Sequence, residues 1–285
     1  MAVTLYPNYI WFAGFASTAE PSITTQNYAC SGGETTGPAY DLLDNNNNNV
    51  ITIDTFEETT DFVVDIDLTA AITGANFAIV DNHNFGTAGG EIKITYSTTT
   101  QAIASAYSGT LGSALGVITV TSNEIIQPTD GILLANFTGT RTSQNWEVDI
   151  EHDGVVLGQF NADVTMGEVA IGVKCAISVS PDANMPYDIE YGNELSMTRS
   201  GQKHSTQLYG KKRAWTLSWN VLQTADLTNL ITAYNVCNGT HRPFWIDLGE
   251  AATLQLYFVR FTGALRYTKL MVGAYAVSFS VEEEL

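Results

Sequence analysis

Basic residues are scarce in the first part of this 285-residue sequence. Residues 1–172 contain only Lys93 and Arg141, against 20 acidic residues, which gives a net charge of −18. Residues 173–285 contain 10 basic and 10 acidic residues, so the whole-chain charge of −18 resides in the first part. A chain this acidic is repelled by a phosphate backbone, which argues against a nucleic-acid partner. The asymmetry predicts two domains, 1–172 and 173–285, with residues 178–192 as the crossing between them.

Charged residues are also scarce overall, at 15%, whereas hydrophobic residues make up 45%. The chain can therefore pack a core, but its surface must be covered mainly by uncharged polar residues, which suits an assembly subunit or a glycan binder better than a metabolic enzyme. No run approaches 18 apolar residues, and the start lacks the basic and apolar segments of a signal peptide. We therefore expect no membrane insertion, and a protein that stays in a cytoplasm or leaves it inside a virion.

Cysteine is rare, and Cys30, Cys175 and Cys237 are too widely spaced for a metal cluster or a disulfide framework. We interpret them as buried free thiols. Asp44 and the five asparagines that follow it could supply oxygen ligands, but Asn49 and Thr55 stand where a calcium loop has Gly and Glu. An Asx-rich turn is the favoured interpretation, so no metal or cofactor is expected.

Alternating apolar and polar residues predict antiparallel strands with one buried face throughout the chain. The clearest alternation falls at 62–68, 92–96, 146–150, 215–221 and 275–281. Glycine and asparagine clusters separate the runs of the first domain, which predicts a jelly-roll β-sandwich there. The fold class is therefore mostly β.

One helix is predicted in the second domain, at about 224–237. Leu227, Leu230, Ile231 and Tyr234 have the spacing of one helical face. Thr224 or Asp226 could cap its start, and Asn238 with Gly239 could end it. The second domain is thus expected to be a sheet with one helix packed across it.

No recognisable catalytic motif is present: the sequence has no nucleophile elbow, phosphate-binding loop, dinucleotide-binding loop or zinc-protease motif. The four histidines stand beside no obvious nucleophile, and the acidic residues lie mostly on the polar side of predicted strands. A hydrolase of envelope polysaccharide would need two positioned carboxylates, which nothing in the sequence singles out. We therefore expect a protein that is not an enzyme.

Two groups of residues are candidates for contacts. Asn82, His83 and Asn84 follow an apolar run and could contact a glycan, although a hydrogen-bonded brace between two sheets is the favoured role. The candidate assembly interface consists of basic and aromatic residues of the second domain: Arg199, Lys211, Lys212, Arg213, Phe244 and Trp245. The basic members could also be a plain solvated edge, and the aromatic members could be core. Residues 5–15 could be a first core strand or an arm on a neighbouring subunit.

Two resemblances to known families bear on function. "AYDLLDNNNNNVITID", "NFAIVDNHNFGTAGGEIKI" and "NWEVDIEHDGVVLGQFNADVTMGEVAIG" resemble segments of discoidin-like, galactose-binding-like jelly rolls, including those of phage virion proteins. "GNELSMTRSGQKHSTQLYGKKRAWTLSWNVL", the predicted helix, "RPFWIDLG", "LYFVRFTG" and "YAVSFSVEEEL" are similar in order to minor tail and tail-tip (distal-tail) proteins of long-tailed phages.

The second resemblance implies that residues 173–285 form a tail-tube-like β-sandwich or barrel with one packed helix. Together the two resemblances imply a structural component of a phage virion, at the tail tip, baseplate or fibre attachment region, which is assembled in the host cytoplasm. The implied partners are copies of the chain in a ring, other tail proteins and a host-surface glycan. The alternative is a carbohydrate-binding module that decorates a capsid or tail fibre.

Overall fold

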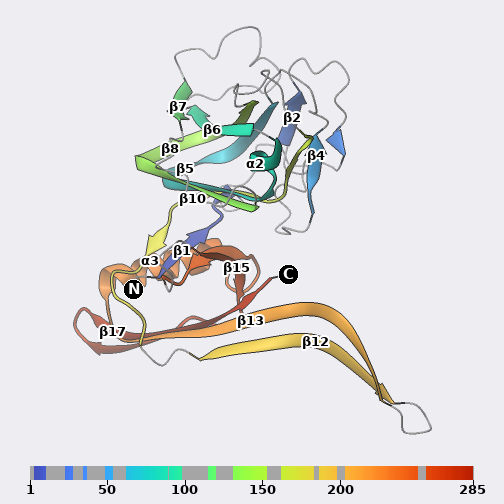
Figure 1. Ribbon diagram of the computed structural model, residues 1–285. Coiled ribbons are helices and arrows are strands. Elements are labelled where there is room, and N and C mark those ends of the chain that lie inside the picture. The colour runs from blue at the N-terminus through green and yellow to red at the C-terminus, as the bar shows by residue number, and fades with distance from the viewer. Residues whose placement is uncertain are drawn as a thin grey trace. The chain divides into compact units, whose positions relative to one another are not determined.

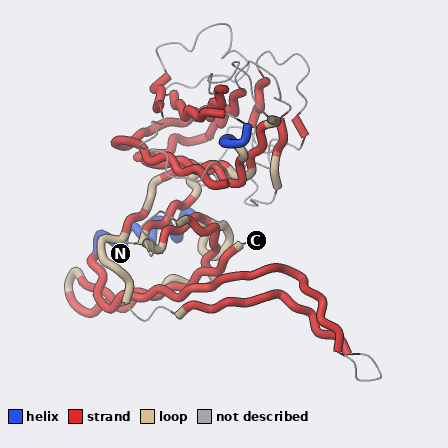
Figure 2. Tube along the Cα trace, viewed as in Figure 1, coloured by secondary structure: helices blue, strands red, loops and turns tan. Residues whose placement is uncertain are grey.

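The computed structural model describes residues 3–10, 23–27, 35–36, 49–53, 62–88, 90–97, 115–119, 131–152, 162–182, 186–197, 203–249 and 255–284. The chain divides into two compact units. The N-terminal unit is Asn8–Lys174, and the C-terminal unit combines Met1–Pro7 with Cys175–Leu285. Strands make up most of the described part of both units (Figure 2), so the prediction of a mostly β protein is confirmed.

The N-terminal unit is built from strands and one short helix (Figure 1). They are β2 (Ile23–Asn27), β3 (Thr35–Thr36), β4 (Ile51–Ile53), β5 (Phe62–His83), α2 (Phe85–Ala88), β6 (Gly90–Ser97), β7 (Leu115–Thr119), β8 (Gly131–His152), β9 (Val164–Met166) and β10 (Val169–Gly172). The described strands form an antiparallel sheet in the order β10-β5-β8-β6-β7, with β2 also on β5, and a smaller sheet β3-β4-β9. Both sheets contribute to one core.

Side-chain alternation explains that core. Val64 and Ile66 of β5 and Val148 of β8 are almost fully buried, and they cluster with Ile53 of β4 and Val164 of β9. Because successive side chains of a strand point to opposite faces, each sheet turns one apolar face to the shared core. The strands predicted at 62–68, 92–96 and 146–150 are confirmed, although β5 and β8 extend much further than the alternation indicated.

The C-terminal unit is a twisted antiparallel sheet with one longer helix. Its elements are β1 (Thr4–Pro7), β11 (Cys175–Ala176), β12 (Tyr187–Met197), β13 (Lys203–Gln223), α3 (Thr224–Val236), β14 (Phe244–Asp247), β15 (Leu256–Phe261), β16 (Arg266–Met271) and β17 (Ala274–Glu283). The strand order is β11-β1-β14-β15-β17-β13-β12, and β16 pairs with β17. Within this unit, β12 and the first half of β13 run together away from the helix (Figure 1).

The helix α3 confirms the prediction at 224–237, but its start differs from the expectation. Gln223 is the N-cap and makes no side-chain cap. Asp226 is instead buried, and its carboxylate accepts hydrogen bonds from the Ser178 hydroxyl at 2.6 Å and the Ser178 N–H at 3.4 Å. The end is as predicted. Asn238 has a left-handed φ of 52°, and the Gly239 N–H donates to the Tyr234 carbonyl at 2.9 Å, which is a Schellman ending.

The division of the chain also differs from the expected boundary. Residues 178–192 lie inside the C-terminal unit, and the crossing falls instead at Lys174 and Cys175. The first residues of the chain belong to the C-terminal unit, because β1 pairs with both β11 and β14. Leu5 on β1 is fully buried, so this part of the N-terminal segment is a core strand.

Candidate functional site

The predicted glycan-contact residues lie where β5 ends. Asn84 joins this end to β9: its side-chain amide donates to the Asp163 carbonyl at 2.8 Å, and its side-chain oxygen accepts from the Thr165 N–H at 2.8 Å. His83 is 3% exposed and stacks on Phe85, and its Nδ1 accepts the Phe85 N–H at 3.1 Å. Asn84 therefore braces the end of β5 against β9 of the smaller sheet, whereas His83 packs on and hydrogen-bonds to Phe85, two residues away.

Asn82 is the exposed member of the three predicted residues. Its backbone is left-handed, with φ 51°, a conformation that asparagine tolerates better than most residues. The N–H of Asn82 donates to the Asp81 carboxylate at 2.7 Å, which stabilises the turn. Of the predicted glycan contacts, Asn82 alone thus presents an exposed side chain, and the glycan itself stays a prediction.

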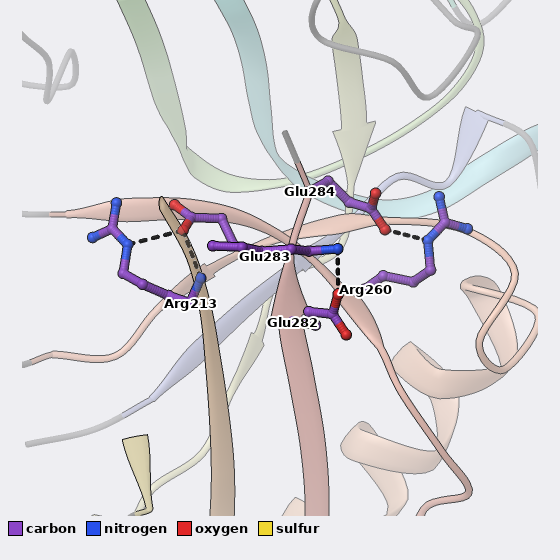
Figure 3. Close-up of polar contacts among 6 residues, drawn as sticks. Arg213, Arg260, Glu282, Glu283 and Glu284 are labelled. Atoms are coloured by element: carbon purple, nitrogen blue, oxygen red, sulfur yellow. Dashed lines mark hydrogen bonds and ion pairs between the residues drawn. The ribbon is translucent and has the colours of Figure 1, made fainter. Parts of the chain in front are cut away.

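Two members of the predicted basic cluster, Lys212 and Arg213, are paired within the chain (Figure 3). Lys212 forms an ion pair with Glu282, and the Arg213 guanidinium donates to the Glu283 carboxylate at 2.9 Å. The guanidinium also lies over the Tyr257 ring, 4.7 Å from its centroid. Burial lowers the pKa of Arg213, but the hydrogen bond and charge of Glu283 outweigh it, so the pKa lies above its ordinary value.

A third pair of the same kind joins Arg260 of β15 to Glu284 (Figure 3). The acidic end of the chain therefore neutralises basic residues of the two strands beside β17, since β17 pairs with both β13 and β15. Lys211 is exposed, whereas Arg199 lies outside the described residues. Of the three consecutive basic residues, Lys212 and Arg213 are neutralised by glutamates, so the predicted cationic docking surface has fewer unneutralised charges than the sequence indicated.

Phe244 and Trp245 do not serve as exposed anchors, which corrects their place in the predicted interface. Phe244 is fully buried and packs against Phe261, with ring centroids 4.5 Å apart. Trp245 is 1% exposed and packs against Phe258, with ring centroids 4.7 Å apart. β14 is an interior strand, paired with β1 and β15, and Phe244 belongs to the core of the C-terminal unit. Neither aromatic ring is therefore available as an exposed anchor.

A row of exposed apolar side chains, missed in the sequence, follows one face of β12. The row consists of Tyr187, Ile189 and Tyr191, which are 46%, 48% and 54% exposed. Tyr187 lies opposite the buried Trp215 and Ile189 lies opposite Arg213. The apolar row therefore lies on the same face of the sheet as the buried core residues, but at a place where nothing described covers that face. Its alternation with acidic residues would have predicted a strand, but not that the apolar side is left uncovered.

The same strand lies at the edge of the sheet that the described residues form. β12 is the last strand in its sheet and pairs only with β13 among the described strands. An exposed edge with apolar side chains is a template for pairing with another chain.

A second exposed apolar feature is the hairpin tip, which we define as Leu270, Met271 and Val272. These residues are 50%, 66% and 92% exposed. The tip connects β16 to β17, and Ala274 just after it pairs with Gln223 at the end of β13. The tip and the Tyr187–Trp215 pair are thus separated by about eight residues of β13, or about 26 Å at the rise of a strand.

The described residues contain no candidate site for a metal ion or for thiol redox chemistry. No group of three metal-ligating His, Cys, Asp or Glu side chains occurs among the described residues. Cys175 and Cys237 are free and buried, as predicted, and Cys30 and Asp44 lie outside the described residues. Burial raises the pKa of both thiols to about 12. In the part of the chain that the structure describes, no helix is both long and apolar enough to span a membrane.

Comparison with known proteins gives matches in structure alone. No known protein family matches the sequence, and no curated protein matches it significantly. A fucolectin from striped bass (Morone saxatilis) serum has a TM-score of 0.36 and 15% identity, over 75% of this chain and 68% of the lectin. CBM32-1 of a family 31 glycoside hydrolase from Clostridium perfringens has a TM-score of 0.32 and 13% identity, over 53% of this chain and 94% of the module.

CpGH89CBM32-6 produced by Clostridium perfringens has a TM-score of 0.33 and 16% identity, over 55% of this chain and 95% of its own length. Two CBM32 modules and a fucolectin are thus among the solved structures to which the chain is similar. All three TM-scores are below 0.5, so the likeness assigns neither a family nor a function to this chain.

Proposed function

We propose that this chain is a non-enzymatic structural component of a phage tail, at the tail tip, baseplate or fibre attachment region, which assembles with copies of itself. The observation that carries the proposal is the apolar row of Tyr187, Ile189 and Tyr191 on an edge strand. Burying the exposed half of each of these large side chains would stabilise a contact by about 1 kcal/mol per residue. Pairing of the β12 edge would add backbone hydrogen bonds.

The occupant of the row is a second copy of the chain. The hairpin tip supplies the matching apolar surface, and it lies elsewhere along the same sheet from the row. A contact between two different surfaces of one subunit is heterologous, and its repetition produces a ring or a filament. This is the kind of contact that a tail component with ring symmetry requires.

Charge favours contact through the C-terminal units. The C-terminal unit, Met1–Pro7 with Cys175–Leu285, contains 9 basic and 10 acidic residues, whereas Asn8–Lys174 contains 3 basic and 20 acidic residues. Two N-terminal units repel each other, and two C-terminal units do not. Further support for a tail protein comes from the sequence, whose strand, helix and strand order resembles that of distal-tail proteins.

Light scattering of the purified full chain, across a range of concentrations, tests the assembly. We expect an oligomer, and we expect Ile189→Lys to shift it to the monomer, because the lysine places an unpaired charge in the apolar contact. Val179→Lys is the matched control: Val179 is 40% exposed but lies outside the row, so this variant should assemble as the wild type does. A wild-type monomer at every concentration, or equal effects of the two lysines, contradicts the proposal.

The location in a virion has its own test. Immunogold labelling of phage particles made in a host that carries this gene should mark the tail end. Labelling of heads alone, or particles without the chain, would overturn the tail assignment and leave the self-assembly result standing.

A second candidate is a carbohydrate-binding module that decorates a capsid or tail fibre. Its candidate contact is the exposed Asn82. Proteins of similar fold include a fucolectin, and a glycan array with the full chain asks whether this chain shares sugar binding. Asn82→Gly keeps the left-handed backbone and removes the amide, so it should abolish binding at this site. Asn229→Ala, on the exposed side of α3, is the control.

A further inference from the structure

A polar hollow lies on the outer face of the C-terminal sheet. On β13, Trp215, Leu217 and Trp219 are buried, so the residues between them point to the other face. β17 has the same alternation, with Val277 and Phe279 buried. The outward positions carry small polar side chains, which form the floor: Thr216, Ser218, Asn220, Ser278 and Ser280.

The strand register aligns this floor in rows. Ser218 on β13 pairs with Ser278 on β17, and Ser278 pairs with Arg266 on β16. One row therefore crosses three neighbouring strands on the same face. In the next row, the hydroxyls of Thr216 and Ser280 are hydrogen-bonded to each other at 2.8 Å. These rows hold hydroxyl groups at the spacing of the strands, about 4.8 Å.

Two adjoining grooves occupy this face. One has a volume of about 330 Å³ and the other about 380 Å³, and Arg266 and Ser278 line both. Asp182 forms a wall of the first groove. Its N–H donates to the Ser218 carbonyl at 2.8 Å, and its carboxylate accepts from the Ser218 hydroxyl at 3.2 Å and the Asn220 N–H at 3.4 Å. The wall is thus fixed before any ligand arrives.

Arg266 places a cation where the grooves meet. The described ion pairs of this unit use Lys212, Arg213 and Arg260, and none of them includes Arg266. Its side chain is exposed. An arginine fork binds a carboxylate through two parallel hydrogen bonds.

The chemistry of the lining limits the ligand. The outward floor positions carry no large apolar side chain. Trp219, Tyr267 and Val277 also line the first groove and Phe279 the second, from strand positions of the opposite alternation. A nucleic acid requires several cations, and the grooves contain one arginine. The lining holds hydroxyl and amide groups, one guanidinium, and the Asp182 carboxylate, which already accepts hydrogen bonds from Ser218 and Asn220. The second groove contains Arg266 without a carboxylate, which suits a ligand with several hydroxyls and one negative charge.

We propose that these joined grooves bind an acidic saccharide, with its carboxylate on Arg266 and its hydroxyls on Ser218, Ser278 and Asn220. This site is on the opposite face of the sheet from the apolar row, because Tyr187 shares the face of the buried Trp215. Binding of the sugar and contact between copies can therefore occur together, and the two proposals stand or fall separately.

Saturation-transfer NMR with the full chain tests the site, with glucuronate, glucose and acetate as probes. Glucuronate carries both the carboxylate and the hydroxyls, and each of the other two carries one of them. We expect glucuronate to bind at least tenfold more tightly than either. Arg266→Gln should weaken glucuronate binding about tenfold, which corresponds to about 1.4 kcal/mol.

Matched variants separate the groove from general charge effects. Lys269→Gln removes an exposed cation from the same strand, outside the groove lining, and should leave glucuronate binding unchanged. Ser278→Val fills the floor between the two grooves and should weaken glucuronate binding while the thermal midpoint stays the same. Equal binding of glucuronate and acetate, equal binding of glucuronate and glucose, or no effect of Arg266→Gln overturns the proposal.

Discussion

Leu5→Ala tests the placement of the first strand, because Leu5 is at the start of the chain but packs in the C-terminal unit. On β1, Leu5 lies between Cys175 of β11 and Ile246 of β14, and it is fully buried. The substitution should therefore destabilise the unit formed by residues 175–285, rather than the unit that follows Leu5 in sequence.

The expected magnitude follows from complete burial. Leucine to alanine in a core costs about 2–5 kcal/mol, and the cost rises with the cavity that remains. Neighbouring strands hold Leu5 on both sides, so the cavity cannot easily collapse, and we expect about 3 kcal/mol. Opening of this unit should become roughly 150-fold more frequent.

Hydrogen exchange followed by mass spectrometry locates the effect. Peptides that cover β14 and β15 should exchange faster in the Leu5→Ala variant, whereas peptides that cover β5 should not change. The matched control is Ile10→Ala. Ile10 is equally buried and only five residues away, but it belongs to the core of the N-terminal unit. This variant should accelerate exchange in β5 and leave β14 unchanged.

The outcome that would refute the reasoning is specific. If Leu5→Ala accelerates exchange in β5 as much as in β14, the two units unfold together or the first strand is not where the structure puts it. If Leu5→Ala changes neither, the segment contributes no core packing.

Two further predictions concern the braced loop and the buried thiols. Asn84→Ala removes the two hydrogen bonds to Asp163 and Thr165, and should lower the free energy of unfolding by about 1–3 kcal/mol in urea titrations. An unchanged midpoint would show that the loop is no brace. Cys175 and Cys237 should resist iodoacetamide at pH 8 in the folded protein and react in urea, as peptide mass spectrometry would detect, because burial raises their pKa to about 12. Above pH 9 the unfolded thiols lose protons that the folded ones keep, so their contribution to stability is present below pH 9 and declines between pH 9 and about 12. Rapid alkylation of the native thiols would contradict their burial.

Several strands and the longer helix could be predicted from local sequence patterns. Alternation at 215–221 and 275–281 predicted strands that the structure contains as β13 and β17. Four apolar residues at helical spacing, followed by Asn238 and Gly239, predicted α3 and its end. These features depend on side-chain periodicity and on backbone conformations that few residues adopt, and both can be read from neighbouring residues.

Whether the candidate site residues are paired or available for contacts depended on residues far away in the chain. Lys211, Lys212 and Arg213 formed a basic cluster in sequence, but Glu282 and Glu283 neutralise two of them only because β17 pairs with β13. Asn84 was a candidate for a glycan contact or a brace, and its hydrogen-bond partners, Asp163 and Thr165, lie some 80 residues later in the chain.

The sequence by itself determined the mostly β class, the helix and its end, and the concentration of negative charge in the first 172 residues, because each depends on composition or local spacing. Only the tertiary structure decided that the first strand belongs to the C-terminal unit, that Phe244 is core, and that Ile189 stays exposed. Burial depends on which strands become neighbours, and long-range pairing of that kind is not encoded in any short stretch of residues.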